Sequence, residues 1–450
     1  MATGGDSLIP SFCSHEHWGS IMAVGLHHDG FRADAEWGAA PWRDVSVVDL
    51  ILDPYLGGAI ADAGFDPHRA ARLGGHADCF AWAVADPARA CEALAPALRA
   101  LRLTGTAQSV QRGIEALYGV DIFTADTAAW VQLDARVREN YRQMFSWHAS
   151  VMETMGLTQA IRPVWPEMYW AESRSADAVL EKGVIHTLMR VDAFMEMWRE
   201  DYPRGRDLVA LTGIEPVDAE SWRAFLDRVF DVARRHGCLG TKQAQAYWRP
   251  LDFSETAEAD VKWSGPRTQE EVRRWQDWVM HECFRRTEAW GWPHQCHVGT
   301  HNLPHSNPAP LEAVAVRYPG MKLVLLHAWP YLEQAGWLAR RYANVFLDQC
   351  WQVILNPEFF RRALREWLGY VPLHKLSVGH DATSVEMAAG ACCMVRRILG
   401  DVLAQEGSAL GIRPSEAEVV AVDMLHHNAV RLYCPGSAGI GQSPIFLSDY

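Results

Sequence analysis

Two histidines flank a glutamate in the segment FCSHEHWGS, residues 12–20. In an extended chain the side chains at positions i and i+2 point the same way, so His15 and His17 can converge on one ion while Glu16 faces elsewhere. Imidazole nitrogens are ligands that Zn²⁺ and similar divalent ions prefer. Taken alone, the pair also fits a polar patch at a strand end, so the assignment depends on what the chain places beside it.

Four more residues with ligand or acid-base chemistry end short apolar runs later in the chain. Lys242 lies in GCLGTKQ, His297 in HQCHVG, His327 in KLVLLHAW and Asp381 in KLSVGHD. Each has an alternative role: His297 as a core histidine, His327 as a hydrogen-bond partner of a loop, and Lys242 as a side chain that extends to solvent. Asp381 could instead cap the helix that starts near Ser384.

The segments that must position these residues alternate, from residue 157 onward, between short apolar runs and amphipathic helices, which is typical of βα units on a parallel sheet. Eight strands are predicted, at LIPSFCSH, TQAIRPV, GVIHTLMRV, GCLGTKQ, HQCHVG, KLVLLHAW, NVFLDQ and KLSVGHD. They predict an α/β fold, a (β/α)8 TIM barrel, in which the carboxyl ends of all strands share one mouth. Strand 8 then lies beside strand 1, and the candidate ligands converge.

Residues 45–156 are rich in Ala, Leu and Arg and predict a large helical insertion, or cap, after strand 1. Asp86, followed by proline, marks the start of one helix that residues 104–105 close. A longer helix is predicted from residue 126 to Gly156, with apolar residues three and four apart. Because no Ser/Gly-rich linker interrupts the later units, residues 1–450 are predicted to form one domain.

The composition excludes several classes of partner. The formal net charge is −13 and no run of Lys or Arg occurs, so nothing supports a nucleic-acid or membrane surface, and a small-molecule or peptide substrate is expected. The ten cysteines lack regular spacing, which favours reduced thiols. No signal peptide and no apolar run of about 18 residues occurs, so a cytoplasmic location is predicted. The sequence leaves a homo-oligomer open.

The pattern resembles the amidohydrolase superfamily of metal-dependent barrel hydrolases. It looks most like the amidohydrolase-related branch, amidohydrolase 2, which includes the N-terminal domains of FluG-type proteins. The matching motifs are QCHVGTHNLPHSNPAPLEAVAVRYPGMKLVLLHAWPYLEQAGWLARRYANVFLDQCW, LSVGHDAT and LHHNAVRLY. The resemblance covers about residues 157–435 and the first strand, whereas residues 45–156 are only loosely comparable.

The resemblance implies that His15, His17 and Asp381 hold a first metal ion, with Asp381 also shuttling protons. It implies that His297 and His327 hold a second ion, or that one of them ligates while the other polarises the substrate. One or two divalent ions are therefore expected, Zn²⁺ first, with Mn²⁺ or another transition metal as alternatives.

The resemblance also bears on two residues near this set. Lys242 matches the strand 4 position where some family members carry a carbamylated lysine that bridges two metal ions. The threonine that usually precedes the strand 8 aspartate is His380 here, which changes the expected surroundings of Asp381.

A metal-dependent hydrolase that cleaves an amide-type C–N bond of a small molecule or modified peptide is the predicted function. A bound ion lowers the pKa of its water to about 7, Asp381 transfers protons, and His327, if not a ligand, polarises the carbonyl. Arg249, Trp18 and His301 are predicted substrate contacts. Arg249 could instead form a salt bridge at the rim, and Trp18 could simply pack.

Two alternatives remain open. Related barrels decarboxylate or isomerise their substrates, and a metal-dependent decarboxylase or a uronate isomerase-like enzyme is the second prediction. Lys242 favours a hydrolase, because a bridging lysine has no part in those other mechanisms. The third interpretation, a barrel used only for binding, is opposed by the intact set of candidate ligands.

Overall fold

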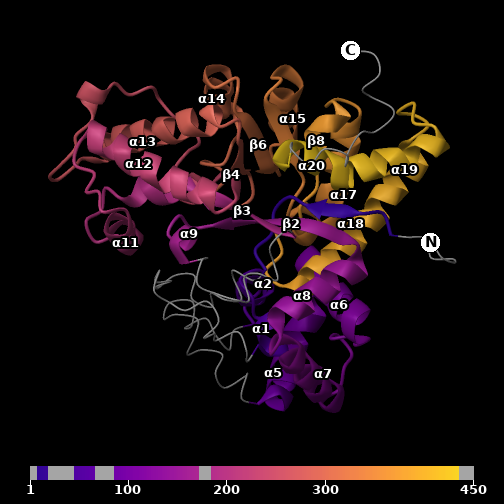
Figure 1. The fold of residues 1–450 in the computed structure, drawn as a ribbon. Coiled ribbons are helices and arrows are strands. Elements are labelled where there is room, and N and C mark those ends of the chain that lie inside the picture. The colour runs from indigo at the N-terminus through magenta and orange to yellow at the C-terminus, as the bar shows by residue number, and fades with distance from the viewer. Residues whose placement is uncertain (1–7, 19–44, 66–85, 172–183, 435–450) are drawn as a thin grey trace.

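The computed structural model describes residues 8–18, 45–65, 86–171 and 184–434. Eight parallel strands follow one another around one curled sheet in the order β1 to β8 (Figure 1). The strands are β1 Ser11–Cys13, β2 Leu157–Val164, β3 Ile185–Arg190, β4 Cys238–Gln243, β5 Pro293–Val298, β6 Lys322–His327, β7 Val345–Asp348 and β8 Leu376–Ser377. All eight lie within or overlap the predicted apolar runs, and the α/β (β/α)8 barrel is confirmed.

A buried carboxylate ties together the strands at which the barrel closes. Asp348, at the end of β7, accepts hydrogen bonds from Oγ of Ser377 in β8 at 2.8 Å and from Oγ of Ser14 just after β1. Its other oxygen accepts from the backbone N–H groups of Cys350 at 2.9 Å and Gly379 at 3.0 Å. Because these donors come from three strand ends, Asp348 holds strand 8 beside strand 1.

Helices fill the long connection between β1 and β2 and alternate with the later strands. The helices before β2 are α1 Val47–Ile51, α2 Leu56–Asp62, α5 Pro87–Leu101, α6 Gly105–Tyr118, α7 Thr127–Tyr141 and α8 Met144–Met155. The later ones are α9 Met168–Ala171, α11 Pro203–Thr212, α12 Ala219–Arg235, α13 Gln269–Ala289, α14 Glu312–Arg317, α15 Leu332–Arg341, α16 Gln352–Leu355, α17 Pro357–Leu368, α18 Val385–Glu406, α19 Pro414–Val422 and α20 Asn428–Tyr433. In Figure 1 helices α5 to α8 gather on one side of the sheet, next to α18. The description of the whole chain as one domain with a cap stays a prediction.

Glycines let α6 approach α18 closely. A Cβ at Gly113 would lie 1.7 Å from the backbone oxygen of Glu386, and a Cβ at Gly390 would lie 1.8 Å from that of Ser109. The buried Glu386 carboxylate then accepts hydrogen bonds from α6, α7 and α8. The donors are Tyr118 Oη at 2.9 Å, Tyr141 Oη at 2.7 Å and Trp147 Nε1 at 2.9 Å. Helix α18, which follows the strand 8 loop, therefore anchors the helical connection.

The predicted helix boundaries in this connection were wrong at two points. Thr104 does not close a helix but caps α6, because its Oγ1 accepts from the N–H of Ala107. The predicted long helix is two helices, with Gln143 in a non-helical conformation between them. The break lets α8 pack against β2 and α18 while α7 packs against α1 and α5. Within the described ranges, no helix has the length and apolar character needed to cross a bilayer.

Candidate metal centre

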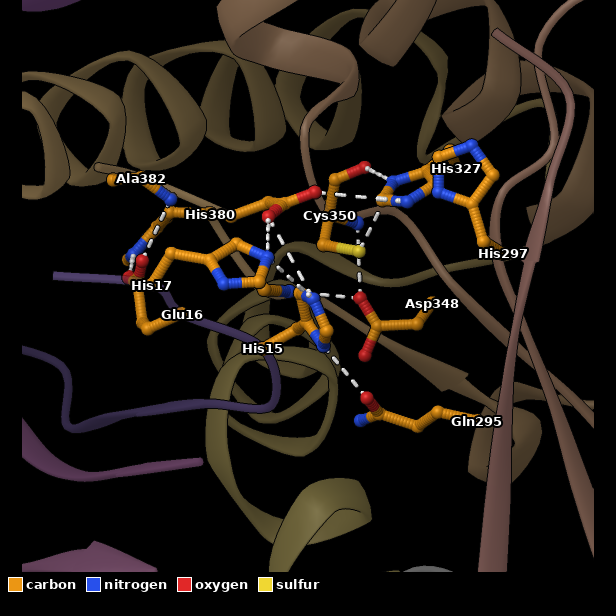
Figure 2. Close-up of polar contacts among 12 residues, drawn as sticks. His15, Glu16, His17, Gln295, His297, His327, Asp348, Cys350, His380 and Ala382 are labelled. Carbon is orange, nitrogen blue, oxygen red and sulfur yellow. Dashed lines mark hydrogen bonds and ion pairs between the residues drawn. The ribbon is translucent and has the colours of Figure 1, made fainter. Parts of the chain in front are cut away.

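The ends of β1 and β8 are joined by backbone hydrogen bonds that bring the candidate ligands together (Figure 2). The N–H of Asp381 donates to the carbonyl of His15 at 2.8 Å, and the N–H of His17 donates to the carbonyl of Ala382 at 3.0 Å. These bonds place the two imidazoles and the carboxylate at one mouth of the barrel although more than 300 residues separate them in the sequence.

The side chains converge on the carboxylate of Asp381. Asp381 Oδ1 lies 2.9 Å from Nε2 of His17 and 3.6 Å from Nε2 of His15, and the two imidazole nitrogens are 3.3 Å apart. His327, the last residue of β6, places its Nε2 3.6 Å from Asp381 Oδ2. Among the described residues, His15, His17 and Asp381 form one close group of potential ligands, and His327, Cys350 and Asp381 form another. Imidazole and carboxylate donors of this kind suit a divalent cation.

Hydrogen bonds on the far nitrogens fix two imidazole rings. Nδ1 of His15 lies 2.6 Å from Oε1 of Gln295. The amide nitrogen of Gln295 donates a hydrogen bond to the carbonyl of Ser14 at 2.7 Å. Nδ1 of His327 lies 2.9 Å from the carbonyl of Cys350, which can only accept, so the proton sits on Nδ1. Nε2 of His327 is then a buried lone pair without a hydrogen-bond partner, as expected of a metal ligand.

The electrostatics also fit a bound cation. Burial lowers the pKa of His15 well below its usual value and that of His327 to about 4, so both imidazoles are neutral at pH 7. Burial alone would raise the pKa of Asp381, but the nearby imidazoles of His15 and His17, which compete for the same proton, hold it well below its usual range. A buried carboxylate among neutral imidazoles keeps an uncompensated charge that a divalent ion would balance.

The backbone is strained around the mouth. Five non-glycine residues among those described have positive φ, and all follow or end strands β5 to β8: Thr300, His327, Ala328, Trp351 and Asp381. Such conformations cost about 1–3 kcal/mol each and persist only where surrounding contacts enforce them.

Glu16 supplies such contacts for Asp381. As predicted, its side chain points away from the ligand cluster, and its Oε1 lies 2.8 Å from Nδ1 of His380. Its Oε2 accepts from the N–H of Ala382 at 2.8 Å, and Cys13 Sγ lies 2.9 Å from Oε1. The unusual histidine before Asp381 is thus the partner of the residue between the two ligand histidines.

His297 and Lys242 lie near the cluster without joining it. The His297 ring centroid is 4.5 Å from that of His327, but its Nε2 lies 3.0 Å from Oγ1 of Thr300. None of the close groups of potential ligands among the described residues contains His297. Lys242, near the end of β4, forms no hydrogen bond or ion pair with any described residue.

The predicted substrate contacts separate into two groups. The Arg249 guanidinium is buried and binds Asp277 at 2.7 Å, the Asp252 carbonyl at 2.7 Å and Gln276. This geometry does not support the predicted contact between Arg249 and substrate. Trp18 is buried against His148 and Arg162. His301 is exposed, and its ring stacks on that of His297 with centroids 6.0 Å apart, so it lies at the mouth.

Two residues at the centre were not predicted from the sequence. Tyr55, which precedes α2 in the helical connection, donates its hydroxyl to Asp381 Oδ1 at 3.2 Å. The ring of Trp351 lies 4.8 Å from that of Tyr55 and 5.4 Å from that of His327. The only available signal was that Trp351 follows strand 7 in LDQCW, at the mouth of a predicted barrel.

Parts of this sequence are similar to those of known proteins. The family model described as Amidohydrolase matches residues 192–376. Protein fluG of Emericella nidulans is 26% identical over 359 aligned positions, and the alignment covers 72% of this chain and 37% of fluG. The chain therefore spans little more than a third of the length of this relative.

Solved structures share the fold over nearly the whole chain. A uronate isomerase from Thermotoga maritima has a TM-score of 0.71 at 14% identity and covers 94% of each chain. A glucuronate isomerase from Caulobacter crescentus has a TM-score of 0.70 at 16% identity, covering 94% of this chain and 91% of its own. A Lactobacillus casei protein, provisionally described as a metal-dependent hydrolase, has a TM-score of 0.55 at 15% identity, covering 94% and 95%. At these identities the similarity shows the fold alone. The family model over residues 192–376 and the fluG relative show that this chain is similar to proteins of the amidohydrolase superfamily.

Proposed function

We propose that this protein is a metal-dependent hydrolase that cleaves an amide-type C–N bond in a small molecule or modified peptide. The observation that carries the proposal is the convergence of Nε2 of His15, His17 and His327 on the Asp381 carboxylate. Of these residues, His15, His17 and Asp381 form a close ligand group that would suit a divalent cation. Zn²⁺ is the proposed ion, and Mn²⁺ or another transition metal suits the same donors.

The residues of the chain supply the proton transfers. A bound divalent cation would provide a water of lowered pKa and an electrophile for the carbonyl oxygen. Asp381 accepts a proton from the attacking water and returns it to the leaving nitrogen. The Tyr55 hydroxyl, on Oδ1, orients the carboxylate and leaves Oδ2 for this transfer. Because Nδ1 of His327 holds the proton, the geometry supports a ligand role for this residue over an electrophilic one.

A uronate isomerase-like reaction is the second candidate, and one contact favours it. Moving a hydrogen between adjacent carbons needs two groups that exchange protons, and Tyr55 and Asp381 form a hydrogen-bonded pair in the site. The full-length similarity to two isomerases supports the shared fold but not their reaction. A decarboxylase has no comparable contact in its favour.

The test compares the two reactions directly. Zinc-loaded protein is incubated with N-acylated amino acids, dipeptides and lactams, and separately with uronates. Hydrolysis releases a free amine, whereas isomerisation moves a carbonyl without releasing one. We expect amine release that falls about 10²- to 10⁴-fold in Asp381→Asn, the usual size of a general acid-base contribution.

The matched control is Asp227→Asn, which removes an exposed carboxylate paired with Arg286 far from the cluster. It should keep full activity. Interconversion of uronates without amine release would favour the second candidate, and full hydrolysis by Asp381→Asn would contradict both. A substrate as the partner, the absence of nucleic-acid and membrane partners, and a cytoplasmic location stay predictions.

A further inference from the structure

A lysine is buried inside the barrel beside the metal centre. Arg190 in β3, Lys242 in β4 and Gln295 in β5 are paired across the sheet, so their side chains face the same side. Gln295 reaches Nδ1 of His15 in the barrel interior at 2.6 Å. The Lys242 side chain therefore faces the interior next to the His15 imidazole, and the residue is only 3% exposed.

Among the residues that the structure describes, this lysine has no partner. It forms no hydrogen bond and no ion pair with any residue in the described parts of the chain. Asp381, an acid whose charge acts on Lys242, is already shared by the three histidines of the metal centre. A buried cation without a counter-ion costs several kcal/mol, so this position calls for a bound anion or for loss of the charge.

The neighbouring Arg190, unlike Lys242, has a carboxylate partner. Its Nε and Nη2 bind the two oxygens of Asp192 at 3.2 and 2.5 Å, and its guanidinium lies 3.9 Å from the Trp165 ring centroid. These contacts hold the guanidinium in a fixed orientation. Asp192 balances the charge of Arg190, whereas the charge of Lys242 remains.

A bridging carbamate on Lys242 is the competing explanation. A bridge needs a second ion. Of His297 and His327, the two residues expected to hold it, only His327 belongs to a close ligand group among the described residues, together with Cys350 and Asp381. Nε2 of His297 lies instead 3.0 Å from Oγ1 of Thr300. The geometry thus favours a free ammonium over a carbamate.

We propose that Lys242, with Arg190 beside it, binds a carboxylate group of the substrate. The inference rests on the proposed function and narrows it: the amide that is cleaved belongs to a molecule that also carries a carboxylate. An ammonium inside a barrel with a bound divalent ion makes the cavity positive, which selects anionic substrates by charge.

The test measures binding of succinate, and of its uncharged analogue succinamide, to the zinc-loaded full-length protein by calorimetry. We expect succinate to bind and succinamide not to bind. Lys242→Met should weaken succinate binding about tenfold or more, because a charge-assisted hydrogen bond is lost. Its zinc content should stay unchanged. The control Lys262→Met removes an exposed lysine paired with Glu271 and should bind succinate like wild type.

Three results would overturn the proposal: no saturable succinate binding to wild type, equal binding by Lys242→Met, or a carbamate on Lys242 detected by ¹³C NMR in labelled bicarbonate. If Lys242→Met does not fold, Arg190→Gln replaces it and should also weaken succinate binding. Since binding is measured without turnover, a failure of the proposed hydrolysis leaves this result intact. Conversely, absence of succinate binding leaves the hydrolysis of neutral amides to be tested by itself.

Discussion

Asp381 is held in its left-handed backbone conformation, with φ of 60°, by contacts on both sides of it. The Glu16 carboxylate binds His380 and the N–H of Ala382. We predict that Glu16→Gln, which replaces one acceptor oxygen by a donor, loses one of these contacts and lets Asp381 shift. Mutation of residues that support metal ligands usually lowers metal affinity 10- to 100-fold. We therefore expect the zinc affinity of Glu16→Gln to fall by about that factor.

Zinc titration with a chromophoric competitor measures this change. The control Glu333→Gln removes an exposed carboxylate that pairs with Arg362 and should bind zinc like wild type. An unchanged zinc affinity in Glu16→Gln would show that the strand ends hold Asp381 without this carboxylate.

At the residue scale, the sequence predicts what strand alternation controls and misses what loops control. His15 and His17 share one side and Glu16 the other because the side-chain period along an extended chain is two. Trp351 and Tyr55 reach the metal centre from loops. Trp351 follows β7 and has a positive φ, and Tyr55 belongs to the helical connection between β1 and β2. Neither placement follows from periodicity, and the sequence marks Trp351 only by its place after strand 7.

Tyr55 tests whether the helical connection takes part in the chemistry. Tyr55→Phe keeps the ring against Trp351 but removes the donor to Asp381 Oδ1. One hydrogen bond to a charged group is worth about 1.5–3 kcal/mol, so we predict that kcat falls about tenfold or more. Steady-state assays on the substrate found by the hydrolysis screen measure the effect. Tyr118→Phe, which removes a donor to Glu386 instead, should retain kcat.

At the element scale, the strands were easier to predict than the helices. Buried parallel strands appear as short apolar runs, and every predicted run contains or overlaps a strand. The break at Gln143 leaves no such mark, because α7 and α8 both continue a helical pattern while packing against different elements. Tertiary contacts, rather than local preference, decide where that helix ends.

The crossing of α6 and α18 depends on glycine. In Gly113→Ala the new methyl group would lie 1.7 Å from the Glu386 carbonyl oxygen, so the helices must separate. We predict a loss of about 1–3 kcal/mol in the free energy of unfolding, typical of overpacking, measured by urea denaturation. Gly400→Ala, in α18 with open space around it, should be neutral or stabilising. Equal stability of both variants would contradict the close approach.

The loop before α2 makes stability depend on pH. Asp53 accepts the N–H of Leu56 at 2.6 Å and binds Thr383, and burial raises its pKa to about 6. The unfolded value is near 3.9, so the folded state binds this proton more tightly. The resulting stability is present in full below pH about 4 and is lost as pH rises through 6, a change of about 3 kcal/mol.

The side chain in Asp53→Asn is neutral at every pH, so the variant should lack this pH-dependent part of the free energy of unfolding. We predict that the unfolding free energy of the variant, relative to wild type, rises by up to about 3 kcal/mol between pH 4 and pH 8, measured by urea denaturation across that range. A constant difference would show that Asp53 titrates alike in the folded and unfolded chain.

At the scale of the whole molecule, the metal centre joins strand ends that are far apart in the sequence. The segment after β1 and the end of β6 supply histidines, and the segment after β8 supplies the carboxylate, so a bound ion stabilises only the closed barrel. A ligand that binds only the folded state raises the free energy of unfolding by RT ln(1 + [L]/Kd). This increase is about 2.7 kcal/mol when the free zinc concentration is a hundred times Kd. We predict that zinc raises Tm and that a chelator reverses the rise. The double variant His15→Ala/His17→Ala should show no zinc-dependent shift, whereas His236→Ala/His374→Ala, which removes two exposed histidines, should respond like wild type. An equal zinc response in both double variants would place the ion elsewhere on the protein.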